Sequence, residues 1–217
     1  MPALLAGCGT SPRQAQEAVI AELPRQRLVD FQNLETFPGN VVCGEWQGKS
    51  PDGEFRNFLP FIVIDGKADP EPALEAVNFY CNNDPRVWLY EKRGIAPLDP
   101  SNTALKQIRT ELRALETALR AYYTDHSALP TTQDGLQSLL EASKSRKTDE
   151  LAGPYLDAVP SDPWGQPYRY RNDSLGGVEP EYELKSLGRD NAPGGEYEDA
   201  DVSIKDMDYI EHALSLR

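Results

Sequence analysis

Residues 184–203, LKSLGRDNAPGGEYEDADVS, gather acidic side chains and glycines into one short stretch. Carboxylate and carbonyl oxygens are the ligands that hard cations such as Ca²⁺ prefer, and glycines let a backbone turn its carbonyls toward an ion. The same composition is also typical of a solvated acidic loop. The stretch therefore predicts either a cation site or a solvated loop, and its five carboxylates are Asp190, Glu196, Glu198, Asp199 and Asp201.

Groups that could catalyse a reaction are few in this sequence. The histidines are His126 and His212, and neither has a nearby serine or cysteine in a known nucleophile motif. The sequence contains no phosphate-binding glycine loop, HExxH motif or CxxC motif. We expect His126 to lie at a helix end and to face water. The sequence therefore predicts that the protein is not an enzyme.

The charge of the chain is strongly negative and unevenly distributed. The net charge is −13, and residues 178–211 contain 11 acids and 3 bases. Nucleic-acid binding needs clustered lysine and arginine, so this balance argues against a nucleic-acid partner. The hydrophobic content of 39% is typical of a globular protein.

The first residues, MPALLAGCGTSPRQ, contain the tetrapeptide LAGC, which resembles a bacterial lipobox. In that reading Cys8 is the lipid-modified first residue of the mature chain, and Gly9 favours the outer membrane. The basic segment and most of the apolar segment expected before such a cysteine are missing. Either the natural start lies upstream of Met1 or the match is due to chance. We expect the first, with residues 1–13 as a truncated lipoprotein-like anchor region.

The other two cysteines are Cys43 and Cys81. An exported location favours a disulfide between them, which would close a loop of about 39 residues and contribute roughly 3–4 kcal/mol in the chain-entropy model. Two buried free thiols are the alternative. A metal site is not expected, because neither cysteine has a second ligand at a short spacing.

The stretch GIAPLDPSNT, residues 94–103, divides the chain, because its glycine, prolines and asparagines interrupt regular structure. We expect a small α+β domain over residues 14–95, followed by a linker over 96–101. Residues 14–24 have helical spacing, and GNVVCGEWQG and NFLPFIVID are typical of antiparallel strands. The segment ALEAVNFYCNN fits either a short helix or a strand.

A long amphipathic helix is predicted from residue 102 to about 124. Apolar residues recur there at steps of three and four, and they are Leu105, Ile108, Leu112, Leu115, Leu119 and Tyr122. HSALPTTQDG ends this helix, and a shorter helix follows at Leu136. Alternating residues in YRYR and EYELKSL predict two strands. The expected fold is α+β, with the long helix packed on a small antiparallel sheet.

The order of these segments resembles the periplasmic domain of the major pseudopilin of type II secretion systems. The motifs that carry the resemblance are LRAYYTDHSALPTTQDGLQSLL, YLDAVPSDPWGQPYRYR and YELKSLGRDNAPGGEYEDADV, over about residues 102–204. The resemblance implies a pseudopilin-like domain over residues 102–212, without catalytic activity.

The resemblance also implies that the acidic stretch binds Ca²⁺. Carried over onto this sequence, the ligands are the carbonyls of Leu187 and Ala192 and the carboxylates of Asp190, Asp199 and Asp201. Two residues depart from the pattern of the family. Arg189 stands beside a ligand where a small residue is usual, and its charge could compete with the ion, while Asn191 replaces a glycine. Without an ion, we expect this loop to fray.

A pseudopilin begins with a prepilin-peptidase site and a long apolar helix, whereas here a lipid anchor and an extra domain are expected. We therefore predict a lipid-anchored accessory protein on the periplasmic side of the envelope, which works with protein partners of a type II secretion or pilus-type machine. The alternative is an envelope lipoprotein that reuses the pseudopilin head to hold a ligand or a secreted partner.

Overall fold

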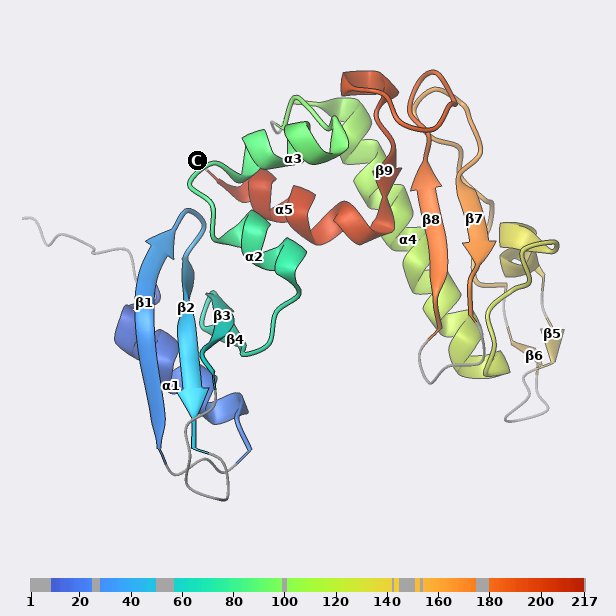
Figure 1. Cartoon of the computed structure of the whole chain (residues 1–217). Helices are drawn as coiled ribbons and strands as arrows, with labels where there is room; N and C mark the ends of the chain where they lie inside the picture. The colour runs from blue at the N-terminus through green and yellow to red at the C-terminus, as the bar shows by residue number, and fades with distance from the viewer. Residues whose placement is uncertain are drawn as a thin grey trace, which may run out of the picture. The chain divides into compact units, whose positions relative to one another are not determined.

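The computed structural model describes residues 9–24, 28–49, 57–98, 101–141, 143–144, 151–152, 154–174 and 180–216. The chain forms two compact units, Met1–Trp88 with Ser215–Arg217, and Leu89–Leu214 (Figure 1). This division falls inside helix α3, Pro85–Arg93. Cys8, the predicted lipidation site, lies outside the described residues. Among the helices of the described ranges, none has the length and apolarity needed to cross a membrane.

The first unit contains an antiparallel sheet with strand order β1-β2-β3-β4. The turn between the last two strands is the dipeptide Asp65-Gly66, and both residues have positive φ angles. A two-residue turn of this kind matches the twist of the strands that it joins. The strands are β1 Val29–Phe37, β2 Val41–Gly48, β3 Leu59–Ile64 and β4 Lys67–Asp69.

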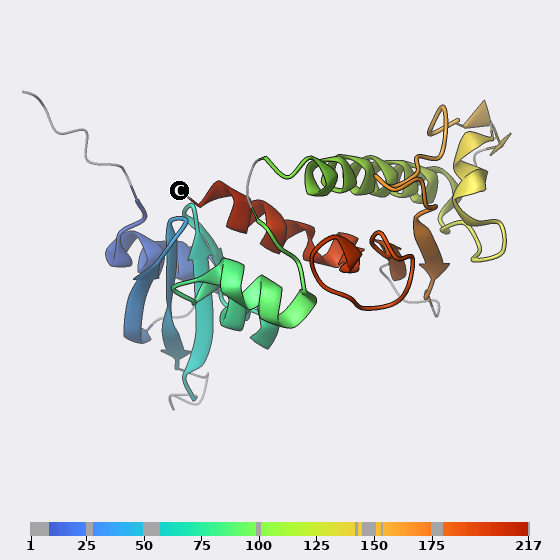
Figure 2. The ribbon, with the colours of Figure 1, turned by 90° about the horizontal axis from the view of Figure 1, so that it is seen from above.

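Helices cover both faces of this sheet (Figure 2). Helix α1, Pro12–Glu22, begins with a capping box in which the side chain of Ser11 accepts from the backbone of Gln14. Its buried residues pack with Trp46 and Phe61 of the sheet. Helix α2, Leu74–Tyr80, packs on the other face. The segment ALEAVNFYCNN, which fitted either structure, is therefore a helix.

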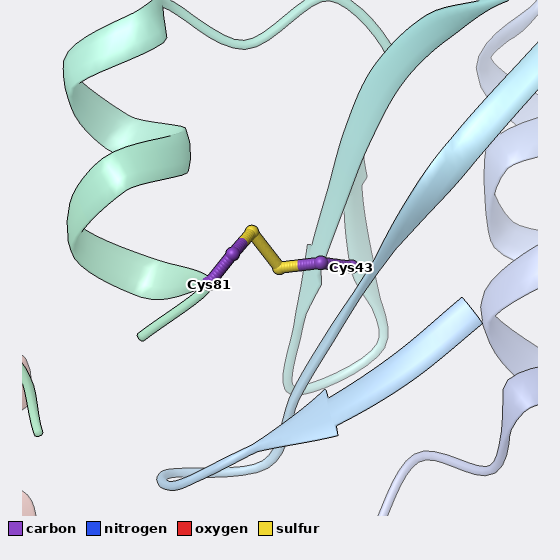
Figure 3. Close-up of a disulfide and its surroundings, with 2 residues drawn as sticks. All are labelled: Cys43 and Cys81. Carbon is purple, nitrogen blue, oxygen red and sulfur yellow. A yellow bond between two sulfur atoms is a disulfide. The ribbon is translucent and has the colours of Figure 1, made fainter. Parts of the chain in front are cut away.

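A disulfide joins β2 to the end of α2 (Figure 3). It links Cys43 and Cys81, whose Cα atoms are 5.9 Å apart. Cys43 is buried among Val41 and Ile62, and Cys81 packs against this cluster. The bond thus connects the sheet to the helix on this face.

Helix α4, Thr103–His126, is the longest element of the second unit. The side chain of Asn102 accepts a hydrogen bond from the backbone N–H of Leu105 and caps the helix. Ser127 ends it in the left-handed conformation. Five of the six predicted apolar residues are buried, namely Leu105, Ile108, Leu112, Leu115 and Leu119. Tyr122 is half-buried.

Helix α4 runs behind a three-stranded antiparallel sheet (Figure 1). The sheet consists of β7 Arg169–Asn172, β8 Tyr182–Ser186 and β9 Val202–Ser203. Tyr168 is buried just before β7, and its hydroxyl donates to Glu111 of α4 at 2.6 Å. Burial raises the pKa of this hydroxyl. The predicted α+β fold, with a long helix packed on a small antiparallel sheet, is confirmed.

The rest of the second unit consists of short elements. The predicted shorter helix is a 3₁₀ helix, η1 Gly135–Leu140. Two other 3₁₀ turns, η2 Tyr197–Asp199 and η3 Ile204–Asp206, precede helix α5, Met207–Ser215. Strands β5 Ser143–Lys144 and β6 Leu151–Ala152 form a small pair.

The expectation that His126 faces water is wrong. His126 is buried, its ring packs 4.2 Å from that of Tyr122, and its Nε2 lies 3.1 Å from the hydroxyl of Tyr155. Helix α4 extends two residues beyond the predicted end at about residue 124. This extension keeps His126 on the face of the helix that carries Tyr122, because residues four apart lie on the same face.

Candidate functional site

The acidic stretch forms a closed loop between β8 and β9, which we call the acidic loop and define as residues 187–201. The backbone N–H of Arg189 donates to the carbonyl of Glu198 at 2.7 Å. Further along, the N–H of Asp201 donates to the carbonyl of Gly194 at 3.2 Å. The loop curves back on itself in Figure 2. Its two halves are therefore held together by the backbone.

Two glycines allow this close approach. Gly188 has a φ of 70° and Gly195 a φ of 87°, in the region that side chains disfavour. A Cβ on Gly188 would lie 2.5 Å from the backbone carbon of Asp199, and one on Gly195 would lie 2.3 Å from the backbone oxygen of Asp199. The backbone of Asp199 thus passes through a space that only glycines leave open.

A buried carboxylate fixes the start of the loop. Asp162 is 3% exposed, and its Oδ1 accepts from the backbone N–H groups of Trp164 at 3.1 Å and Gln166 at 2.9 Å. Its Oδ2 accepts from the hydroxyl of Ser186 at 2.6 Å. The Ser186 oxygen in turn accepts from the N–H of Gly188 at 3.1 Å. This chain positions the backbone at Leu187, one of the predicted ligands.

The last turn of α3 contacts the other side of the loop. The hydroxyl of Tyr90 donates to Glu196 at 3.1 Å, and its ring lies 5.5 Å from that of Tyr197. The N–H of Tyr197 donates to the carbonyl of Gly94 at 2.8 Å. The loop is therefore supported by a helix that precedes it by about a hundred residues.

Each predicted ligand carboxylate has a hydrogen-bond partner in the loop or next to it. Oδ1 of Asp190 accepts from the N–H of Ala192 at 3.0 Å. Oδ1 of Asp201 accepts from the N–H of Gly194 at 3.1 Å, and its Oδ2 lies 3.3 Å from Nζ of Lys185. These contacts fix one oxygen of Asp190 and both oxygens of Asp201.

Arg189 bridges two acids of the loop. Its Nε and Nη2 donate to the two carboxylate oxygens of Asp199 at 3.0 and 3.2 Å. Its Nη1 donates to Glu198 at 2.8 Å. These bonds, led by the one to Asp199, raise the pKa of Arg189. The guanidinium thus stands at a carboxylate that the resemblance assigns to calcium.

The donor atoms of the loop suit a hard cation. They are all oxygens, from carboxylates and backbone carbonyls, which is the ligand set of Ca²⁺. Arg189 pairs with Asp199 and Glu198, and Lys185 contacts both Asp201 and Glu183, so the five loop carboxylates outnumber the cationic side chains that contact them. Among the described residues, however, no three His, Cys, Asp or Glu side chains converge into a metal-binding group. An ion held here would rely on carbonyls as well as carboxylates.

The sequence prediction missed Asp162, Ser186 and Tyr90 as supports of this loop. Asp162 begins the turn DPWG, which the sequence analysis gave only as part of a longer motif. Its position gave no sign that the carboxylate reaches Ser186, 24 residues away. Nothing in the pattern of α3 pointed to the contact of Tyr90 with Glu196.

Comparison with known proteins identifies the family of the second unit. The family model described as Type II secretion system (T2SS), protein G matches residues 98–205. The type II secretion system core protein G of Pseudomonas aeruginosa is 32% identical over 106 residues, which are 48% of this chain and 72% of the relative. The protein of the same name from Vibrio cholerae is 35% identical over 94 residues, which are 43% of this chain and 62% of the relative.

A solved structure is also similar to this chain. It is the crystal structure of the major pseudopilin from the type 2 secretion system of enterohaemorrhagic Escherichia coli, with 28% identity and a TM-score of 0.35. The match covers 46% of this chain and 83% of that one. On the evidence of the family model and the relatives, the chain belongs to the type II secretion system protein G family, whose members are non-catalytic pseudopilins of a cell-envelope secretion machine.

Proposed function

We propose that this chain is a lipid-anchored accessory pseudopilin that works with a type II secretion machine on the periplasmic side of the envelope. The observation that carries the proposal is the matched region, residues 98–205, which forms a helix-and-sheet head with a closed acidic loop. Residues before it form a separate unit with its own sheet and disulfide. This extra unit favours an accessory role over that of the main filament subunit.

In this proposal the acidic loop holds a calcium ion. The carbonyls of Leu187 and Ala192 and the carboxylates of Asp190, Asp199 and Asp201 would supply the ligands. Bound calcium would neutralise the excess negative charge and tie the start of the loop to its end. The hydrogen bonds of Asp162 and Ser186 and the close packing at Gly188 support this proposal, because they hold the start of the loop next to the backbone of Asp199.

The proposed anchor is a lipid attached to Cys8. Because Gly9 follows this cysteine, the usual lipoprotein sorting pattern places the protein at the outer membrane. Several acyl chains, at about 0.8 kcal/mol per buried CH₂, hold a protein durably on a membrane. Mass spectrometry of the mature N-terminus from the natural host should find acylated Cys8. An N-terminus that begins with unmodified Met1 would remove the anchor from the proposal.

Affinity capture tests the proposed place of the protein. The full chain, cross-linked in its natural host, should retrieve other components of the secretion machine. The control is a variant with Leu115→Asp, because a buried charge on α4 disrupts the head. This variant should lose these components.

The second candidate function is an envelope binding module, and the separate fold of the first unit favours it. That unit lies outside the matched residues and has its own two-sided core. The same capture experiment distinguishes the two functions. If it retrieves an exported protein or cell-wall material and no components of the secretion machine, this second function is supported and the first is rejected.

A further inference from the structure

Arg189 places a positive charge where the proposed calcium ion needs a ligand. Its guanidinium takes both oxygens of Asp199 and one oxygen of Glu198. A carboxylate whose two oxygens face a guanidinium has little to offer a metal ion, and the two cations also repel each other. Calcium binding through Asp199 therefore requires Arg189 to leave this carboxylate.

We propose that Arg189 is an internal counter-ion that competes with calcium for Asp199. It stabilises the metal-free loop and lowers the affinity of the loop for calcium. This inference rests on the proposed calcium function. The free energy that the bonds from Arg189 to Asp199 give to the metal-free loop must be given up when calcium binds, because a ligand stabilises only the state that it prefers.

The exchange can leave the backbone hydrogen bond of Arg189 in place. The N–H of Arg189 stays bonded to the carbonyl of Glu198, which holds the base of the side chain in place. The Arg189 side chain is 56% exposed and already contacts the Glu198 carboxylate, which is 58% exposed. After release from Asp199, the guanidinium can remain on Glu198.

The size of the effect follows from the exposure of the pair. Exposed ion pairs contribute little, but bidentate pairs that join a network contribute more. We therefore expect removal of the Arg189 charge to raise the calcium affinity by a factor of about 3–10. The direction is opposite to that of a structural arginine, whose loss would weaken the site.

The test compares two matched variants of the full chain. Arg189→Gln removes the charge and keeps a polar side chain. Arg171→Gln is the control, because Arg171 is 59% exposed and is paired with Asp173 at 2.7 Å, outside the acidic loop. Calorimetric titration with CaCl₂ measures affinity, and thermal melting in EDTA measures the stability of the metal-free protein.

We expect R189Q to bind calcium about 3–10 times more tightly than R171Q and to melt about 1–2 °C lower in EDTA. Equal affinity and equal melting of the two variants would overturn the role of Arg189 and leave the calcium function standing. Binding by R189Q alone would support the inference strongly. If no form binds calcium at millimolar concentration, the calcium function and the competition both fail.

Discussion

Gly188→Ala should destabilise the second unit by about 3–4 kcal/mol. The new Cβ would lie 2.5 Å from the backbone of Asp199, and alanine disfavours the φ of 70°. The backbone cannot yield easily here, because Ser186 and Asp162 hold one side and the hydrogen bond from Arg189 to Glu198 holds the other. Urea denaturation of the full chain measures the loss.

Gly194→Ala is the matched control for this substitution. Gly194 also has a positive φ, of 95°, but a Cβ there meets no atom within 4 Å. We expect this variant to lose only the cost of the backbone conformation, about 1–2 kcal/mol. Equal losses of stability in the two variants would show that the backbone of Asp199 does not crowd a side chain at residue 188.

Removal of the disulfide should have a similarly large effect on the first unit. The bond spans 38 residues, so its loss costs about 3–4 kcal/mol in the chain-entropy model. It also joins β2 to α2 in a unit whose described residues form a separate core on each face of the sheet. Denaturation of the double variant Cys43→Ser/Cys81→Ser measures this effect.

Reduction of the unmodified protein provides the control. A reducing agent should lower the stability of the unmodified chain by about the same amount and leave the double variant unchanged. If the double variant were as stable as the oxidised protein, the disulfide between β2 and α2 would make no contribution to the stability of the first unit.

The sequence predicted best the elements with a strong and regular pattern. The apolar spacing on α4 lies on one helical face for about five turns, so the predicted bounds of the helix are nearly correct. Strands β2 and β3 are rich in apolar, β-branched and aromatic residues and are bounded by glycine, proline and aspartate, and they were found for that reason. Such patterns can be recognised within one short segment of the sequence, without knowledge of the tertiary structure.

The elements that were missed have weak local patterns. Strand β1 is mostly exposed and has a bulge between Gln32 and Glu35, which breaks the alternation expected of a strand. Helices α3 and α5 have nine residues each, too few to show a clear period. Their formation depends on packing with distant segments.

The acidic loop was predictable by composition but not by its contacts. The five acids and the glycines mark the loop in the sequence. Its support comes from Asp162, which bonds Ser186 just before the loop and 24 residues along the chain, and from Tyr90, which precedes its partner Glu196 by 106 residues. Only the tertiary fold brings these side chains to the loop.

The most direct test of the account is thermal melting of the full chain with calcium and with EDTA. If calcium is present at 100 times its dissociation constant, linkage predicts a gain of about 2.7 kcal/mol, or roughly 5–10 °C. Asp190→Ala should abolish this gain in stability. The control is Asp173→Ala, which should retain the gain, because Asp173 lies outside the acidic loop and is paired with Arg171. Equal melting with calcium and with EDTA would contradict the proposal that the acidic loop holds an ion.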